Sequence, residues 1–227
     1  MKLTPKRLLL SAASLSFFLV PSCASQKVVP ISDVRILQNK RIATIQREKP
    51  DFTAETPGPA ALRFAGIPGR IGAEQIMNAT GNQIVRDNSV EDPAVRVSKE
   101  LAETLRNKCF VSLATPIKTN ETDPEEIAKL ASRADYVVDV QTEYWGLGYF
   151  SRGSDQYHVT VYSRFNLIDC KTGKVIASGE FSRESQKNDP SFTYDGLIKN
   201  QAKGLKQELR VIENDSLFLY RSGVLKL

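Results

Sequence analysis

Residues 157–165 read Tyr157-His158-Val159-Thr160-Val161-Tyr162-Ser163-Arg164-Phe165. Their side chains alternate between two sides of an extended chain, and one of these sides is mostly apolar or aromatic. A period of two residues is typical of a strand that buries one face and exposes the other. A half-buried antiparallel strand is therefore predicted here. Its more apolar side consists of Tyr157, Val159, Val161, Ser163 and Phe165.

Strand-like segments flank this stretch on both sides. Before it, Tyr136-Val137-Val138-Asp139-Val140 leads to Trp145, and after it residues 175–183 form a third segment. The connection Cys170-Lys171-Thr172-Gly173-Lys174 contains a glycine that can adopt the positive φ of a tight turn. The three segments together predict an antiparallel three-strand meander in the C-terminal half of the chain.

Helix signals lie on both sides of the predicted meander. Asp92 is a good N-cap, Pro93 suits the first helical position, and apolar residues then recur at helical spacing, which predicts a helix over 93–107. Asp123 and Glu126 have the spacing of a capping box and predict a second helix. A closing helix is expected from the apolar residues Leu197, Ile198, Ala202, Leu205, Leu209 and Ile212.

The N-terminal half carries weaker signals. Short strands are expected at 34–37, 42–45 and 109–114, and a short helix at 74–85. Residues 50–72 contain four prolines and four glycines, which predicts a long loop. The order of these elements predicts an α+β fold. We expect a mixed sheet of about four to five strands, including the C-terminal meander, with about three helices on one face.

The first 22 residues are typical of an export leader. Lys2, Lys6 and Arg7 precede an apolar run from Leu8 to Val20, and this run is shorter than the roughly 20 residues needed to span a bilayer. The end of the segment, Val20-Pro21-Ser22-Cys23, resembles a bacterial lipoprotein signal. That resemblance implies cleavage before Cys23 and acylation of its thiol. Ordinary cleaved secretion and a retained anchor are the alternatives.

The lipoprotein resemblance also implies an address and a domain plan. Ala24 and Ser25 follow the cysteine without an aspartate, which by resemblance to enterobacterial sorting places the protein on the periplasmic face of the outer membrane. We expect a leader over 1–22, a tether over 23–30 and a single periplasmic domain over 31–227. The membrane is then a partner through the N-terminal lipid.

The charge balance argues against a nucleic-acid partner. The formal net charge is +5, and three of the positive charges belong to the leader. The remaining chain is nearly neutral and mixes both signs along its length, whereas nucleic-acid binding needs a clustered basic face. No nucleic-acid partner is expected.

Cysteine and histidine usage limits the chemistry of the chain. Beyond Cys23 only Cys109 and Cys170 remain, and an exported compartment permits a disulfide between them. Two buried free thiols are the alternative. With His158 as the only histidine, a zinc site of ordinary spacing is not expected. The sequence shows no clustered catalytic groups, so we expect no enzyme activity and no cofactor.

One aromatic segment is a candidate for partner binding. Residues 144–150, Tyr144-Trp145-Gly146-Leu147-Gly148-Tyr149-Phe150, concentrate four aromatic side chains of the kind that anchor protein interfaces. Alternation along a strand would instead place about half of them in the core. Both interpretations stay open for Tyr144, Trp145, Tyr149 and Phe150.

Two phrases resemble a family of periplasmic α/β domains. Residues 131–138 (Ala-Ser-Arg-Ala-Asp-Tyr-Val-Val) and 167–175 (Leu-Ile-Asp-Cys-Lys-Thr-Gly-Lys-Val) are similar to the helix end and hairpin of CsgG-type lipoproteins, LpoB-type activators and the amino-terminal domain of TolB. The resemblance spans about residues 90–212. It implies a membrane-anchored, non-enzymatic lipoprotein that binds an envelope protein in a structural or regulatory role. The alternative is a small-ligand carrier or transporter accessory with residues 50–72 as a lid.

Overall fold

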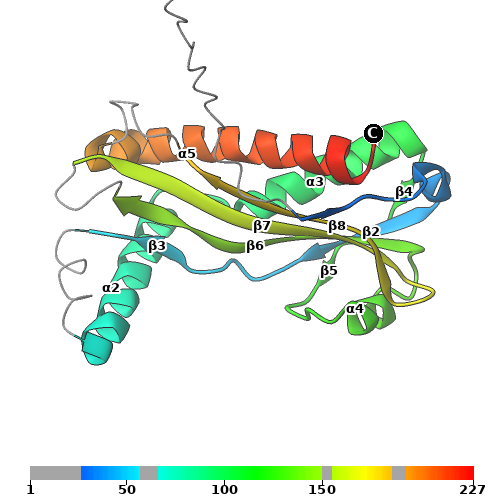
Figure 1. The fold of residues 1–227 in the computed structure, drawn as a ribbon, viewed down its shortest axis with the longest axis horizontal. Helices are drawn as coiled ribbons and strands as arrows, with labels where there is room; N and C mark the ends of the chain where they lie inside the picture. Colours follow the sequence, from blue (N-terminus) through cyan, green and yellow to red (C-terminus); the bar gives the residue numbers. More distant parts are fainter. Residues whose placement is uncertain (1–26, 57–65, 150–154, 186–192) are drawn as a thin grey trace, which may run out of the picture.

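The computed structural model describes residues 27–56, 66–149, 155–185 and 193–227, with side chains described from residue 71 in the second range. The leader, Cys23, residues 57–65 and Phe150 lie outside these ranges. The described chain forms one eight-stranded sheet with helices on both of its faces (Figure 1). Its strands are β1 (Val28–Val29), β2 (Arg41–Gln46), β3 (Phe52–Ala54), β4 (Ser112–Leu113), β5 (Ile117–Lys118), β6 (Tyr136–Tyr149), β7 (Tyr157–Asp169) and β8 (Lys174–Glu184).

The predicted meander is confirmed and forms the centre of the sheet. β6 pairs antiparallel with β7 along its whole length, and β7 pairs antiparallel with β8. Gly173, in the turn between β7 and β8, has a φ of 69°, as the turn requires. The predicted apolar side of β7 is buried, because Tyr157, Val159, Val161 and Phe165 are each at most 4% exposed.

The rest of the sheet is built from short strands. The order is β1-β8-β7-β6-β2-β4, with β3 paired to β6 and β5 paired to β2. β2 and β3 both run parallel to β6, at residues 136–138 and 145–147 of that strand respectively. The sheet is mixed, as expected, but it has more strands than predicted, because the additional ones are only two or three residues long.

The helices are α2 (Gly66–Asp87), α3 (Pro93–Cys109), α4 (Pro124–Leu130) and α5 (Tyr194–Phe218), and a π-helical segment, η2 (Leu219–Val224), follows α5. α2, α3 and α5 contribute to the main apolar core with one face of the sheet. α4 packs on the opposite face, where Ile127 meets Val137 and Ile168 in a second cluster. The expected three helices on one face are α2, α3 and α5, and α4 is an additional helix on the opposite face.

The two helix starts were predicted with different success. At α3, Asp92 accepts a hydrogen bond from the Ala94 amide at 3.0 Å, and Pro93 takes the first helical position, as expected. At α4, Asp123 caps the helix through the Glu125 amide. The predicted capping box is wrong, since the Asp123 amide donates to Glu121 rather than to Glu126.

Two predicted strands take other structures. Residues Val34–Leu37 form a 3₁₀ helix, η1, because Asp33 accepts from the Arg35 amide and side chain and so starts a turn. In the segment 109–114, Cys109 is the last residue of α3 and only Ser112–Leu113 is strand. The helix ends at Phe110, whose φ of 55° reverses the chain.

The predicted loop over 50–72 is wrong for residues 52–54, which form β3, and for residues 66–72, which begin α2, while residues 57–65 lie outside the described ranges. Tertiary contacts explain the difference, since Asn82 accepts from the Phe52 amide at 2.9 Å and Asn78 accepts from the Thr53 hydroxyl at 2.8 Å. At Gly81 the helix lies against the β3 backbone so closely that an added Cβ would be 1.8 Å from the Phe52 carbonyl oxygen. Packing against β3 therefore supports a helix that extends back through the Pro/Gly-rich residues 66–72.

Candidate functional site

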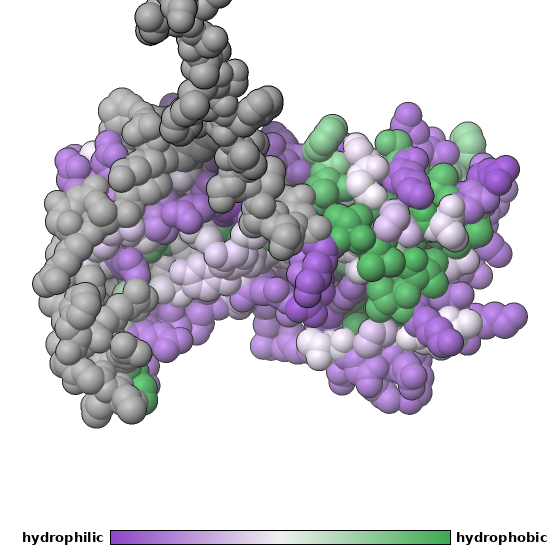
Figure 2. Space-filling model, viewed as in Figure 1, coloured by the Kyte–Doolittle hydropathy of each residue, from purple (hydrophilic) through white to green (hydrophobic). Residues whose placement is uncertain are grey.

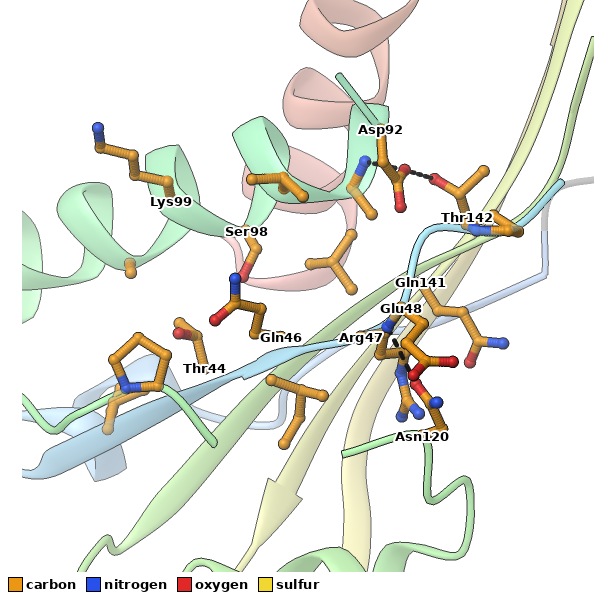
Figure 3. Close-up of a pocket in the computed structure, with 18 of the residues that line it drawn as sticks. Thr44, Gln46, Arg47, Glu48, Asp92, Ser98, Lys99, Asn120, Gln141 and Thr142 are labelled. Carbon is orange, nitrogen blue, oxygen red and sulfur yellow. Dashed lines mark hydrogen bonds between the residues drawn. The ribbon is translucent and has the colours of Figure 1, made fainter. Parts of the chain in front are cut away.

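A groove opens between α3 and the sheet, beside the C-terminal end of β2 (Figure 3). Its cavity volume is about 490 Å³, within the range of about 300–1,000 Å³ that is common for ligand sites. We call it the α3–β2 groove. Its walls come from β2 (Ile42, Thr44, Ile45, Gln46), α3 (Ala94, Val95, Ser98, Lys99, Ala102, Glu103), β4 (Leu113), β6 (Val140, Gln141, Thr142) and neighbouring loops (Arg47, Glu48, Pro50, Asp92, Ala114, Pro116, Asn120, Thr122).

The groove exists because two neighbouring strands separate. The β2–β6 ladder ends at the pair Thr44–Val138, and β3 pairs with β6 only from Trp145 onward. Between these points β6 has a bulge at Thr142–Tyr144, and a bulge bends a strand and increases its twist. The end of β2 therefore has no ladder partner on β6, which leaves space beneath α3.

Neutral polar side chains face this space. Thr44 and Gln46 come from β2, Ser98 from α3 and Gln141 from β6. Figure 3 shows the Ser98 hydroxyl and the Gln46 amide pointing toward one another across the groove. Within the described part of the chain, none of these four side chains makes a hydrogen bond, although Ser98 is only 6% exposed. Hydroxyl and amide groups with free hydrogen-bonding capacity, next to an apolar floor, suit a polar ligand without charge.

The carboxylate at one end of the groove accepts hydrogen bonds from the protein itself. Asp92 is 7% exposed and accepts from the Ala94 amide and from the Thr142 hydroxyl at 2.5 Å. Burial raises the pKa of Asp92, although these hydrogen bonds and the nearby positive charge of Lys49 act in the opposite direction. The arrangement fixes the first turn of α3 to β6, and we assign Asp92 a structural role.

An ion pair holds the other end of the groove together. The Arg47 guanidinium contacts the Asp139 carboxylate through Nε at 3.1 Å and Nη2 at 2.8 Å, and it also donates to the Glu121 carbonyl oxygen. The two side chains are 10% and 4% exposed. Arg47 thus connects β2 to β6 where the ladder between them has ended. The charges of Arg47 and Asp139 are therefore paired within the protein. Lys99 points away from the groove (Figure 3).

The predicted aromatic site is divided between the core and the surface. Trp145 is fully buried, donates to the Pro50 carbonyl oxygen at 3.0 Å and packs edge-on against Phe52, so its predicted contact with a partner is wrong. Tyr149 is half-buried, and its ring packs against that of Tyr157 at an interplanar angle of 38°. Tyr144 is half-buried on the other sheet face beside Tyr162. Partner binding through Tyr144 and Tyr149 stays a prediction, as does the part of Phe150, which lies outside the described residues.

The predicted disulfide is not formed, and the alternative of two free thiols describes the structure. Cys109 belongs to the core on the α3 side of the sheet, while Cys170 packs with the α4 cluster on the opposite face. The sheet between them explains why they do not meet. Burial raises the pKa of the Cys109 thiol and, with the nearby Asp169 and Asp135, that of the Cys170 thiol to about 11. Cys23, the expected acylation site, lies outside the described residues.

Neither a metal-binding cluster nor a membrane-spanning helix is present in the described ranges. No group of three or more His, Cys, Asp or Glu side chains is arranged to hold a metal ion in the part of the chain that the structure describes. In the same residues, no helix combines the length and the apolar character needed to cross a membrane.

A second surface is apolar and lies next to the N-terminal strand. Figure 2 shows apolar side chains gathered over the right half of the view, where Figure 1 places β1, η1 and the start of β8. The exposed apolar residues of these elements are Val29, Ile36 and Val175, with Val29 57% exposed. We call this the β1 apolar surface. Gathered apolar residues on a protein surface often mark an interaction site.

Comparisons with known proteins leave the family open. No protein-family model and no curated protein matches the chain. Solved structures with some likeness include a PelC dodecamer from Paraburkholderia phytofirmans (17% identity, 80% of this chain and 94% of that chain, TM-score 0.31) and the lipoprotein GNA1162 from Neisseria meningitidis (13%, 79% and 98%, TM-score 0.29). The hypothetical protein CT253 from Chlamydia trachomatis is another (13%, 79% and 96%, TM-score 0.35). These scores assign neither a family nor a function. The resemblance to CsgG, LpoB and TolB stays a prediction.

Proposed function

We propose that this protein is a membrane-anchored periplasmic lipoprotein that binds a segment of an envelope protein in the α3–β2 groove, without catalysis. The anchor is the lipid expected on Cys23, and the expected membrane is the outer one, at its periplasmic face. The domain then works by local concentration, because a protein confined to a surface meets a partner on that surface more often.

One observation carries the binding proposal. Thr44, Gln46, Ser98 and Gln141 converge on the groove from three elements, and within the described ranges they form no hydrogen bonds. Hydroxyl and amide groups that make no hydrogen bond to the described protein can donate to and accept from a ligand that enters the groove. An extended peptide offers alternating amide and carbonyl groups, which match these side chains.

The proposal of binding without catalysis rests on the charged groups. The carboxylates of Asp92 and Asp139 each accept hydrogen bonds from the protein itself, and the Arg47 guanidinium is shared between Asp139 and Glu121. A group held in this way is poorly placed to transfer a proton to a ligand. The β1 apolar surface supports the same kind of role, as a further contact area for a protein.

Site-specific photocrosslinking in intact cells tests this proposal. A benzoylphenylalanine at Val95, which is 50% exposed on α3 at the groove, should give one dominant protein adduct. The matched control is Leu130, which is 55% exposed on α4 at the opposite sheet face. Adding Ser98→Trp, which fills the groove, should remove the Val95 adduct. Equal adducts from both positions, or an adduct that survives Ser98→Trp, would contradict binding in the groove.

The groove volume of about 490 Å³ also favours a second candidate, a carrier of a small polar molecule. Native mass spectrometry of the protein purified from its own membrane would then reveal a bound mass that Ser98→Trp displaces. The lid expected for this carrier falls mostly on residues 57–70, whose side chains lie outside the described part of the chain, so it stays a prediction; of the described residues of 50–72, Pro50 lines the groove.

A further inference from the structure

The outer side of α5 carries a group of basic side chains, and the described chain begins at Lys27 beside the neighbouring strand β8. After the non-helical residues 199–202, α5 runs as a regular helix to Phe218. Lys203, Lys206 and Arg210 recur at spacings of three and four residues and therefore share one side of it. They line a shallow hollow of about 580 Å³ on that side. Further along the same side are two exposed apolar residues, Val211 (43% exposed) and Phe218 (73% exposed).

Within the described residues, the ion pairs of α5 involve residues other than the three basic side chains of this surface. Of the four acidic residues on α5, Asp195 pairs with Lys199, Glu213 with Arg96 and Asp215 with Arg183, while Glu208 lies between Lys206 and Arg210 in the sequence. No ion pair involves Lys203, Lys206 or Arg210 in the ranges that the structure describes. On the open sheet face, by contrast, the positive charge of Arg164 is paired with Glu143. The α5 surface is thus a group of three basic side chains on one helix that form no ion pair within the described residues.

The expected anchor residue is only a short stretch of chain from the first described residue. Cys23 precedes Lys27 by four residues, which span at most about 14 Å. The Lys27 carbonyl oxygen accepts from the Glu180 amide, so the described chain begins beside β8. Three residues further along β8, Arg183 pairs with Asp215 of α5. An acylated Cys23 therefore keeps the α5 side of the domain within a short distance of the bilayer.

From the tether length and the unpaired charge we infer that the outer side of α5 lies against anionic phospholipid headgroups, with Phe218 at the acyl boundary. This inference rests on the proposed lipid anchor and adds an orientation to it. Basic side chains are attracted to anionic bilayers, and an exposed aromatic ring on the same helix side inserts at the interface. Binding of a protein partner is then assigned to the α3–β2 groove.

Quenching by brominated phospholipids measures which surface meets the bilayer. The full-length acylated protein is reconstituted into vesicles of phosphatidylglycerol and phosphatidylcholine, with tryptophan placed at Phe218, at Ile36 of the β1 apolar surface, or at Leu130 of α4. Trp145 is fully buried and gives the same background in each variant. We expect Phe218→Trp to be quenched at least about twice as strongly as Leu130→Trp. Reversing the three charges (K203E, K206E and R210E together) should reduce the Phe218→Trp signal to the Leu130→Trp level while the protein stays on the vesicles.

Three results would overturn the inference. Equal quenching at Phe218 and Leu130, or stronger quenching at Ile36, would place another surface on the bilayer and leave the α5 surface to a protein partner. A Phe218→Trp signal unchanged by charge reversal would remove the role of the basic residues. If the unmodified protein fails to float with vesicles, the anchor and the orientation fail together, whereas flotation without the Phe218 signal overturns the orientation alone.

Discussion

The Arg47–Asp139 pair gives the most quantitative prediction about the groove. Asp139→Ala removes two contacts, at 3.1 and 2.8 Å, and leaves a guanidinium that is 10% exposed with only the Glu121 carbonyl oxygen as partner. Breaking a buried ion pair by removing one partner costs about 3–5 kcal/mol, because the other charge stays buried without compensation. We expect a loss of this size in the free energy of unfolding.

The double variant Arg47→Met/Asp139→Leu supplies the control. Apolar replacement of both partners removes the buried charges together, so this variant should be no less stable than the wild type. Urea unfolding of a leaderless form with Cys23 replaced by Ser, followed by fluorescence of the single tryptophan, Trp145, measures each free energy. A loss below about 1 kcal/mol for Asp139→Ala, or additive losses in the double variant, would refute the reasoning.

Three further predictions concern the groove, the α2–β3 contact and the cysteines. Because the pKa of Asp92 is raised in the folded state, its contribution to stability is present below the unfolded pKa and is lost as pH rises. Asp92→Asn should therefore gain stability relative to the wild type between pH 4 and pH 7, as measured by urea titrations. A stability difference that stays constant over this pH range would contradict the prediction. Gly81→Ala should lower the free energy of unfolding by about 1–3 kcal/mol in thermal unfolding, because the added Cβ clashes with the Phe52 carbonyl. Gly72→Ala, with no atom within 4 Å of its Cβ, should be neutral or stabilising. Equal effects of the two substitutions would argue against the close α2–β3 contact. Cys109 and Cys170 should react with iodoacetamide at pH 8 at least about tenfold more slowly than a peptide cysteine, as followed by mass spectrometry, and fast labelling of Cys170 would contradict its raised pKa.

Local patterns predicted the parts of the fold that depend on neighbouring residues. The alternation along 157–165, the positive φ at Gly173 and the Asp92–Pro93 helix start each involve a few adjacent side chains, and each has the expected structure. The failures occur where distant contacts decide. Residues 66–72 look like a loop, but α2 is held against β3 by Asn78 and Asn82, and the sequence gives no indication of those contacts.

The groove could not be predicted for a related reason. Thr44, Gln46, Ser98 and Gln141 are ordinary in their own segments and come together only through the sheet order. The space between them depends on the bulge at Thr142–Tyr144, which has no clear sequence signal. Asp92 was recognised as a helix cap, but its bond to Thr142 joins residues 50 positions apart.

The central claim is that a lipid on Cys23 anchors this domain to an envelope membrane. Mass spectrometry of the N-terminal peptide of the protein, purified from the membranes of its natural host, tests this most directly. The predicted result is a chain that begins at Cys23, with a diacyl group on the sulfur. A chain that begins at Met1, or that has an unmodified terminus and fractionates with soluble proteins, would contradict the claim.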